Sequence, residues 1–443
     1  MAEQQKTQIP NIFKIPELRN KILFTLGILV VLRLGAHVTI PGINRLVVET
    51  QFGNANSMFG MLDIFTGGAL QRATVFALGI MPYISASIIF QLLTAVFPYF
   101  EKLQKEGEEG RKRIAQYTRY ATVGLAAVQG YGYAVYLQSQ VPQAVEMGGF
   151  RFVLTTVITL VSGAVFVMWL GEQITERGLG NGMSLIIFFS IIERFPQTVG
   201  QIYELWQTGA ISIFAILAFF ATMVLVIAGV VFMTMALRKI PIQIPRKVVG
   251  RNQVRQGQKT HLPLRLNSAG VMPIIFAQSI LFFPATLGTF FPDVGWVQGV
   301  SRVFAVESLW YLVLFTILIV FFTYFYTAII FNPIDLAENM KKQGGFIPGI
   351  RPGARTAEYI DRVLTRVTLP GSFFLAAIAI VPLLIFRLGP FRSIPTFIGG
   401  TGLLIVVGVA LDTIQQMQSH LLLRHYEGFM KKGKLRGRGA RTF

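Results

Sequence analysis

The sequence predicts an all-α integral membrane protein that crosses the bilayer ten times. Its 443 residues are 53% hydrophobic and only 14% charged, and the mean hydropathy is +0.57. The chain contains many apolar runs of about 20 residues, the length that a helix needs to cross a bilayer. Most Lys and Arg residues fall in alternate connections between these runs, as expected for the cytoplasmic loops of a membrane protein.

The first predicted span, residues 22–40, follows a polar and mildly basic segment at residues 1–21. It is longer than the apolar core of a signal peptide and lacks a small-residue cleavage site, so we interpret it as a retained span. A basic tail at residues 419–443 follows the last span. The ten predicted spans are residues 22–40, 73–97, 117–137, 152–171, 183–202, 212–237, 268–290, 309–331, 364–386 and 397–418.

The distribution of basic residues predicts the orientation of the chain. Six segments on one side of the predicted membrane contain 32 of the 40 Lys and Arg residues. By the positive-inside rule this side is cytoplasmic, so we expect a multi-pass protein of the cell inner (cytoplasmic) membrane with both termini in the cytoplasm. Much of the net charge of +19 is therefore a topology signal. The six segments are residues 1–21, 98–119, 171–181, 237–266, 332–366 and 419–443.

Residues 57–98 contain a short apolar piece followed by a full-length one. The first piece, residues 57–65, is too short to cross a bilayer, and Gly67 and Gly68 follow it. The second piece, residues 73–97, is long enough to span. We interpret the pair as a re-entrant or plugging element, because irregular backbone at membrane depth is stable only inside protein or beside a water-filled cavity. The stretch therefore indicates an aqueous path through the molecule.

A six-residue motif recurs in the second and seventh predicted spans. The pattern Gly-(Ile/Val)-Met-Pro-x-Ile occupies residues 79–84 and again residues 270–275. The copies are five spans apart, and an odd number of spans per half makes the two halves insert with opposite orientation. Inverted repeats of this kind place the functional path between the halves. We therefore expect two inverted five-helix halves, at residues 22–202 and 203–418.

Two predicted cytoplasmic loops carry more basic charge than orientation requires. Residues 238–266 contain eight Lys and Arg residues and no acid, and alternating isoleucines ahead of Gly250 favour a projecting hairpin. Residues 332–366 contain a Pro-Gly-Ile-Arg-Pro-Gly turn that presents Arg351. Each loop is either a topology signal alone or a docking face for a large anionic or amphipathic partner, such as ribosomal RNA or an acidic motor surface.

The predicted spans contain few ionisable residues. Arg33 and Asp412 lie within spans, and Glu193 and Arg194 lie toward the outer end of another. An intramembrane charge is by default a candidate functional residue, but two isolated ones do not form the relay of a proton-coupled transporter. We therefore interpret Arg33 and Asp412 as structural residues that pair with a helix or with a partner subunit.

The sequence shows no catalytic constellation. The four histidines are scattered, no HExxH motif occurs, and the absence of cysteine excludes thiolate chemistry. Residues 428–434 have Walker-like Gly-x4-Gly-Lys spacing, but Leu435 replaces the required Ser or Thr. We expect no enzyme activity, no cofactor and no metal site, so any motor is a separate protein.

Motifs along nearly the whole chain carry a family resemblance. They lie at residues 40–42, 65–70, 77–88, 116–120, 169–178, 180–182, 260–264, 346–353 and 399–401. Together they resemble the SecY family of protein-conducting channels, the large subunit of the bacterial translocon. The resemblance implies an hourglass pore between the two five-helix halves, with a short plug helix in the outer funnel and a ring of apolar side chains at the waist.

Two features of the residues agree with this waist. Ile80 and Ile84 are four residues apart and share a helix face, and a wide apolar constriction can seal against ions by dewetting. An isoleucine on a membrane helix can equally face lipid or another helix. The resemblance assigns the pore ring to Ile80, Ile84, Ile187, Ile275 and Ile405. It assigns the plug to residues 57–70, with Met58, Phe59, Met61, Leu62, Ile64, Phe65, Gly67 and Gly68.

The resemblance also implies a lateral gate between spans two and three on one side and spans seven and eight on the other. The expected partners are SecE-like and SecG-like small membrane subunits, a SecA-like motor ATPase, the ribosome, preprotein signal sequences and membrane lipid. The gate residues are Ser85, Ile88, Gln91, Asn267 and Phe283. The docking residues are Arg246, Lys247, Arg251, Arg255, Lys259, Arg351 and Arg355.

The expected function is a passive protein-conducting channel that moves unfolded preproteins across the membrane and membrane proteins laterally into it. A docked ribosome or motor ATPase supplies the energy. The first alternative is a secondary transporter of a small solute, which would need a polar or charged site near the midplane. A membrane-embedded lipid-processing enzyme would need clustered His, Asp or Glu near one interface. The apolar waist and the basic loops favour the channel.

Overall fold

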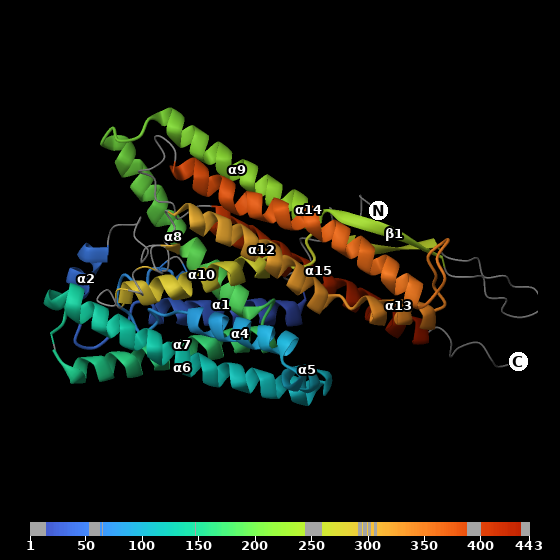
Figure 1. The fold of residues 1–443 in the computed structure, drawn as a ribbon, viewed down its shortest axis with the longest axis horizontal. Helices are drawn as coiled ribbons and strands as arrows, with labels where there is room; N and C mark the ends of the chain where they lie inside the picture. The colour runs from blue at the N-terminus through green and yellow to red at the C-terminus, as the bar shows by residue number, and fades with distance from the viewer. Residues whose placement is uncertain are drawn as a thin grey trace, which may run out of the picture. The chain divides into compact units, whose positions relative to one another are not determined.

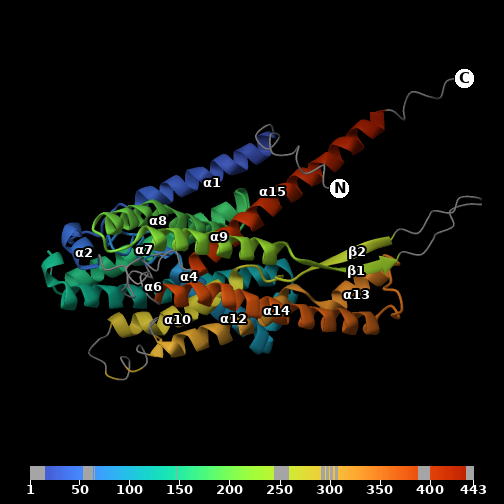
Figure 2. The same ribbon diagram turned by 90° about the horizontal axis from the view of Figure 1, so that it is seen from above.

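The structure is a computed structural model that describes residues 15–52, 63, 65–146, 148–243, 259–290, 295, 299, 303–304, 308–387 and 400–435. Within these residues, each of the ten predicted spans overlaps one long helix (Figures 1 and 2). These helices are α1 (Pro16–Gly35), α4 (Met81–Val96), α6 (Glu108–Gln140), α7 (Phe150–Arg177), α8 (Gly182–Gln207), α9 (Ile213–Met235), α10 (Met272–Phe290), α12 (Leu309–Ile330), α14 (Ala354–Arg387) and α15 (Gly400–Leu435). Shorter elements are α2 (Arg45–Phe52), α5 (Pro98–Lys105), η3 (Pro142–Ala144), α13 (Pro333–Lys342), β1 (Leu237–Gln243) and β2 (Lys259–Arg265).

Polar side chains at several helix starts explain where those helices begin. The side chain of Asn181 accepts a hydrogen bond from the backbone N–H of Met183 at the start of α8. Ser212, Ser308 and Asn332 cap α9, α12 and α13 in the same way. Each cap satisfies a backbone donor that the first helical turn leaves without an intrahelical partner.

Four helices of the described residues are long and apolar enough to cross a membrane by themselves. They are Phe150–Arg177, Ile213–Met235, Leu309–Lys342 and Ala354–Ile385. The helices α4 and α5 pass the same test only as a pair. They are bent by 97° where Phe97 is extended ahead of Pro98, the geometry of a broken span or a re-entrant loop. The apolar part of α10, Met272–Thr286, is shorter. With the helices that overlap the remaining predicted spans, these elements confirm the predicted all-α membrane fold.

The predicted span at residues 73–97 is wrong in its first part. Residues 75–80 form turns, and the helix begins only at Met81. Gly79 has a positive φ of 53°, a conformation that glycine adopts at little cost, and Pro82 lies in the first turn of α4, where its missing N–H is tolerated. Hydropathy alone could not distinguish this turn from a helix, because both are apolar.

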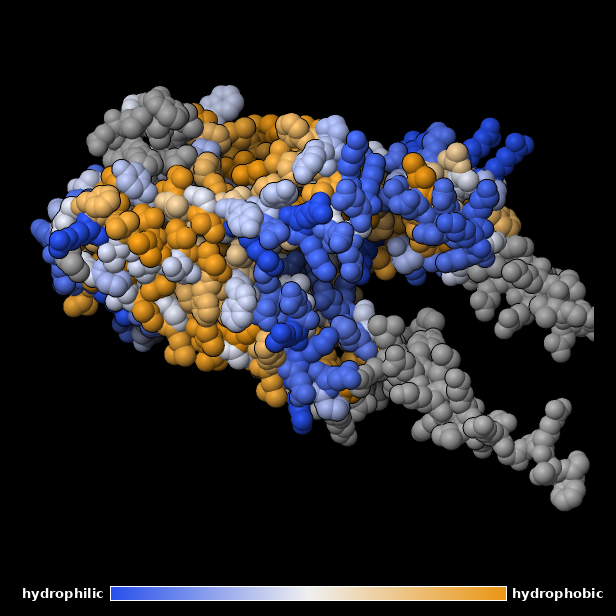
Figure 3. Space-filling model, turned by 90° about the horizontal axis from the view of Figure 1, so that it is seen from below, coloured by the Kyte–Doolittle hydropathy of each residue, from blue (hydrophilic) through white to orange (hydrophobic). Residues whose placement is uncertain are grey.

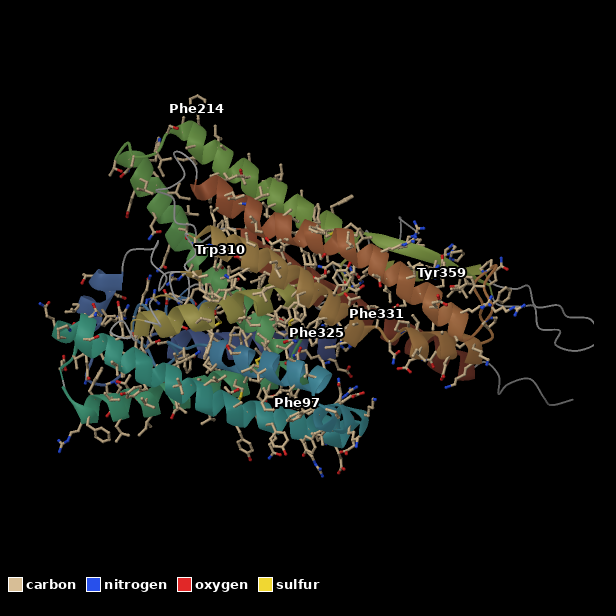
Figure 4. The ribbon with its side chains drawn as sticks, viewed as in Figure 1. Phe97, Phe214, Trp310, Phe325, Phe331 and Tyr359 are labelled. Atoms are coloured by element: carbon tan, nitrogen blue, oxygen red, sulfur yellow. The ribbon has the colours of Figure 1, made fainter. Side chains whose placement is uncertain are left out.

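Large apolar side chains cover much of the helical surface that Figure 3 shows. Phe214 at the start of α9 and Trp310 at the start of α12 are 78% and 65% exposed, and Phe97 lies exposed at the end of α4 (Figure 4). Aromatic residues at the ends of apolar helices are typical of the two membrane–water interfaces. These helices therefore present the surface expected of a protein in contact with lipid.

The chain divides into two compact units. Unit 1 comprises Met1–Phe195 and Val409–Phe443, and unit 2 comprises Pro196–Gly408. Each boundary falls inside a helix, α8 or α15. The predicted division into halves at residues 22–202 and 203–418 stays a prediction.

Unit 1 is built around α6 and α7, which pack along each other, with α4 against α6 and α1 against α7. Residues 73–75 pair with residues 38–40: the N–H of Ile40 donates to the carbonyl of Ala73, and that of Val75 donates to Val38. Gly163 of α7 allows this approach, because a β-carbon there would lie 2.0 Å from the carbonyl oxygen of Val75. The irregular segment before α4 is therefore enclosed by helices.

Unit 2 packs α12 between α10 and α14, with α9 and α13 also on α14. The predicted hairpin is confirmed in its described part: β1 and β2 pair antiparallel, with Leu237 opposite Arg265 and Gln243 opposite Lys259. The described part of the hairpin packs against a small apolar core that also includes residues from α13, α14 and the turn between them. The buried members of this core are Ile240, Ile242, Leu264, Met340, Ile347, Ile360 and Leu364.

The two copies of the sequence repeat have the same local structure. Gly79 and Gly270 both have positive φ, of 53° and 64°, and each precedes a helix that begins with Met-Pro, α4 in unit 1 and α10 in unit 2. The glycine reverses the chain and the proline occupies the first helical turn. This agreement supports the internal repeat, whereas the inverted relation of the two halves stays a prediction.

Candidate functional site

The five isoleucines of the predicted pore ring are all buried. Their exposed fractions range from 0% for Ile405 to 5% for Ile84. Ile80 is the residue before α4, and the N–H of Ile84 donates to its carbonyl at 3.1 Å, so these two share one helix face as predicted. Ile187 lies on α8, Ile275 on α10 and Ile405 on α15. Their burial argues against the alternative that they face lipid, whereas their arrangement as a ring stays a prediction.

The predicted plug is described only at its C-terminal end. Met58, Phe59, Met61, Leu62 and Ile64 lie outside the described residues. Phe65 is 3% exposed, and Gly67 and Gly68 have positive φ values of 63° and 89°. The hydroxyl of Tyr133 on α6 donates to the carbonyl of Leu70 at 3.1 Å. The end of the predicted plug is thus a tight, buried turn.

Asp63 is the centre of this turn, and the sequence analysis did not single it out. Its side chain is fully buried, and its Oδ1 accepts from the backbone N–H groups of Leu70 at 2.8 Å and Gln71 at 3.0 Å. Its Oδ2 forms an ion pair with Arg194 of α8. The sequence did contain an indication of this pair: Asp63 is an acid within an apolar stretch, and Arg194 is a base within an apolar predicted span.

The neighbouring residue on α8 makes a second ion pair. Glu193 pairs with Arg33 of α1, which confirms the interpretation of Arg33 as a structural residue paired with a helix. Glu49 lies 3.7 Å from Arg72 and 2.9 Å from Arg45 in the same unit. Glu193 and Arg72, the most buried of these side chains, need such compensation, because desolvation penalises a buried charge.

Four of the five predicted gate residues lie on two helices, and Asn267 lies in the connection between β2 and α10. In unit 1, Ser85, Ile88 and Gln91 lie on α4; Ile88 is 2% exposed, and Gln91 donates to the hydroxyl of Ser87 at 3.1 Å. In unit 2, Asn267 is 5% exposed and donates to the carbonyl of Gly270, and the partly buried Phe283 lies on α10. The lateral gate itself stays a prediction.

The predicted docking loops contact each other within unit 2, through the bridge between Gln243 and Phe346. Arg246, Lys247, Arg251 and Arg255 lie outside the described residues, and Lys259 begins β2. Arg351 and Arg355 are exposed, and Arg351 lies between Gly349 and Gly353, whose φ values are 83° and 109°. The hydroxyl of Thr356 donates to the carbonyl of Arg351 at 2.9 Å. The turn therefore presents Arg351 on a defined backbone, as the sequence predicted.

A buried, irregular, glycine-rich turn within an all-α membrane fold, together with a basic hairpin outside the spans, places the chain among polytopic membrane proteins. A family model described as SecY matches residues 74–414. The chain is 47% identical over 430 residues to the protein translocase subunit SecY of Pseudomonas aeruginosa, covering 96% of each chain. It is 46% identical to that of Aquifex aeolicus, covering 95% of this chain and 98% of the relative. The chain belongs to the SecY family.

Solved structures show the same fold. "The structure of a protein conducting channel" matches with a TM-score of 0.65 at 16% identity, covering 93% of this chain and 97% of the other. Sec61 in a canine ribosome–channel complex from the endoplasmic reticulum matches with a TM-score of 0.63 at 17% identity, with the same coverage. A further match, titled for the plug domain of the SecY protein that stabilises the closed state and maintains a membrane seal, has a TM-score of 0.62 at 17% identity, also covering 93% and 97%.

Proposed function

We propose that this chain is a passive protein-conducting channel that moves unfolded preproteins across the cytoplasmic membrane and membrane proteins laterally into it. The observation that carries the proposal is the 47% identity to a protein translocase subunit over nearly the full length of both chains. A channel needs a path that substrates can cross and ions cannot. The five predicted pore-ring isoleucines suit this need, because an apolar waist opposes a continuous column of water without a charged door.

The cytoplasmic face of the channel would dock its energy source. In unit 2, the basic hairpin and the turn that presents Arg351 offer cationic groups for a ribosome or a SecA-like motor ATPase. Two structural relatives are named as ribosome-bound: Sec61 in the canine ribosome–channel complex and the idle yeast Ssh1 complex on the 80S ribosome. The further partners are SecE-like and SecG-like small subunits, signal sequences and membrane lipid, with both termini of the chain in the cytoplasm.

A small-solute transporter would instead need a polar site that is free to bind its substrate. Asp63 and Arg194 form a buried charged pair, which at first sight meets this need. Both carboxylate oxygens of Asp63 are already engaged by Arg194, backbone N–H groups and a hydroxyl. This pair suits a structural role better than solute binding.

The test is reconstitution of the full chain in sealed vesicles with either a SecA-like motor and ATP or translating ribosomes. We expect a preprotein carrying a signal sequence to become protected from added protease, and no protection without the motor or ribosome. A passive channel should hydrolyse no ATP by itself. Absence of protected preprotein, together with uptake of a small solute along an ion gradient, would favour the transporter.

A further inference from the structure

We propose that Asp63 and Arg194 form a latch that holds the end of the plug against α8 and sets how readily the channel opens. The inference rests on the channel function proposed above. We call this pair the plug latch. Both residues belong to unit 1 and neither belongs to the predicted pore ring. They are positioning residues, because they act through the plug rather than on the substrate.

The carboxylate of Asp63 fixes the turn that ends the plug. Its Oδ1 accepts hydrogen bonds from the N–H groups of Leu70 and Gln71, at 2.8 and 3.0 Å. The same oxygen accepts from the hydroxyl of Thr66 at 3.0 Å. Because Oδ2 pairs with Arg194, one buried carboxylate joins the backbone of this turn to a neighbouring helix. Side chains with 0% and 11% exposure place the ion pair away from water.

Gly67 and Gly68 seat the turn directly on the helix that supplies Arg194. A β-carbon on Gly67 would lie 3.3 Å from the Cα of Ser190 and 3.2 Å from Oε2 of Glu193. A β-carbon on Gly68 would lie 3.6 Å from Nη2 of Arg194. Both glycines have positive φ, which other residues rarely adopt. The contact is therefore specific to this backbone shape and would be lost if the turn moved away from α8.

Arg72 places a second guanidinium beside the same turn. Its Cζ would lie 3.6 Å from a β-carbon on Gly68, the same distance as Nη2 of Arg194. Two cations near one glycine repel each other, and the negative charges of Asp63, paired with Arg194, and of Glu49, 3.7 Å from Arg72, offset this repulsion. Loss of the Asp63 charge therefore leaves Arg194 without the carboxylate that pairs with it, beside the second cation.

Opening the channel requires the plug to leave its closed position. If the turn leaves with it, Asp63 separates from Arg194, and each charge loses its partner in a poorly solvated site. Breaking a buried ion pair is unfavourable because the remaining charges are not compensated. The latch thus favours the closed state until a substrate in the channel makes the open state more stable.

The test is the ion conductance of resting channels, with the full chain in planar bilayers and no motor, ribosome or preprotein. Asp63→Asn keeps a side-chain oxygen that can accept from Leu70 and Gln71 but removes the charge that pairs with Arg194. We expect the open probability of this variant to rise about tenfold or more, which corresponds to about 1.4 kcal/mol. Arg194→Gln should have a similar effect, and Arg194→Lys, which keeps the charge, should stay closer to the wild type.

The double variant separates a latch from two independent defects. If the pair acts as a unit, Asp63→Asn combined with Arg194→Gln opens no more often than the more open single variant. A matched control is Glu172→Gln, which removes the partly exposed pair that Arg119 and Glu172 form between α6 and α7 at 2.8 Å. This control should leave resting conductance unchanged.

A preprotein with a weakened signal sequence gives a second readout. We expect motor-driven transport of this substrate to rise in the Asp63→Asn variant, whereas transport of a normal preprotein stays near the wild-type rate. Resting channels as silent as the wild type in both single variants, or strictly additive effects in the double variant, would overturn the latch. The proposed function would fail separately, if the wild-type channel moved no preprotein at all.

Discussion

Gln243 of β1 and Phe346, in the turn between α13 and α14, exchange both backbone hydrogen bonds, at 2.9 and 3.0 Å. Gln243 is the last residue of β1, at the end of the strand pair farthest from the base of the hairpin, and Phe346 lies just before the turn that presents Arg351. The described strands of the hairpin and the turn that presents Arg351 are therefore joined by one pair of backbone hydrogen bonds, which links the two predicted docking loops. The neighbouring residues Ile242 and Ile347 belong to the apolar core of unit 2.

This relation makes Arg351 a sensitive test of docking. We predict that Arg351→Glu leaves membrane insertion of the chain intact but lowers motor-driven preprotein transport about tenfold or more, because a repulsive charge replaces an attractive one at the contact. Transport into reconstituted vesicles at several salt concentrations measures the effect. Arg362→Glu is the control, since Arg362 is an exposed base of α14 already paired with Glu358. Equal transport by both variants and the wild type would indicate that the basic residues of this loop only set the orientation of the chain in the membrane.

The apolar waist predicts a second outcome. Replacing Ile80 and Ile84 together by Gly should raise the ion leak of resting vesicles about tenfold or more, because a wider and wetter waist loses its dewetting barrier. Ile89→Gly is the control, since Ile89 lies on the same helix but is 44% exposed. A leak in the control as large as in the double variant would indicate damage to α4 rather than an opened waist.

Glycine packing in unit 1 gives a prediction for stability. A β-carbon on Gly163 would lie 2.0 Å from the carbonyl oxygen of Val75, whereas one on Gly124 of α6 would meet nothing within 4 Å. We expect Gly163→Ala to lower the free energy of unfolding by about 1–3 kcal/mol through overpacking. Gly124→Ala should leave it unchanged or raise it by about 1 kcal/mol, because alanine favours helix. Thermal unfolding of the purified chain in detergent measures both; a smaller loss at Gly163 than at Gly124 would contradict the packing argument.

The same region shows what the sequence could and could not predict. The long helices follow from apolar runs and polar caps, which are local, so all ten predicted spans overlap a helix of the described residues. The turn at residues 75–80 was missed because its apolar residues fit a buried turn as well as a helix. Gly79 and Pro82 are the residues that indicate this turn. The same pair recurs at the start of α10, where Gly270 precedes the helix and Pro273 lies in its first turn.

The pairing of charges was the least predictable part. Arg33 was expected to find a partner, but nothing in its spacing indicated Glu193, which is far away in the sequence. Asp63 was not singled out, because one acid in an apolar stretch has no periodic pattern. Ion pairs between distant segments depend on how the helices pack, and apolar patterns fix that packing only loosely.

The last prediction concerns the lateral gate. Ser85 on α4 and Phe283 on α10 are the residues that the resemblance places on opposite sides of it, and the chain has no native cysteine. We predict that Ser85→Cys combined with Phe283→Cys forms a disulfide, which requires Cα atoms within about 7 Å. This short link should block secretion and membrane insertion, and a longer flexible crosslinker should restore both, because a signal sequence must pass between the helices. Each single cysteine variant controls for the substitution. If link length has no effect, the two helices merely pack; if no link forms, the gate lies elsewhere.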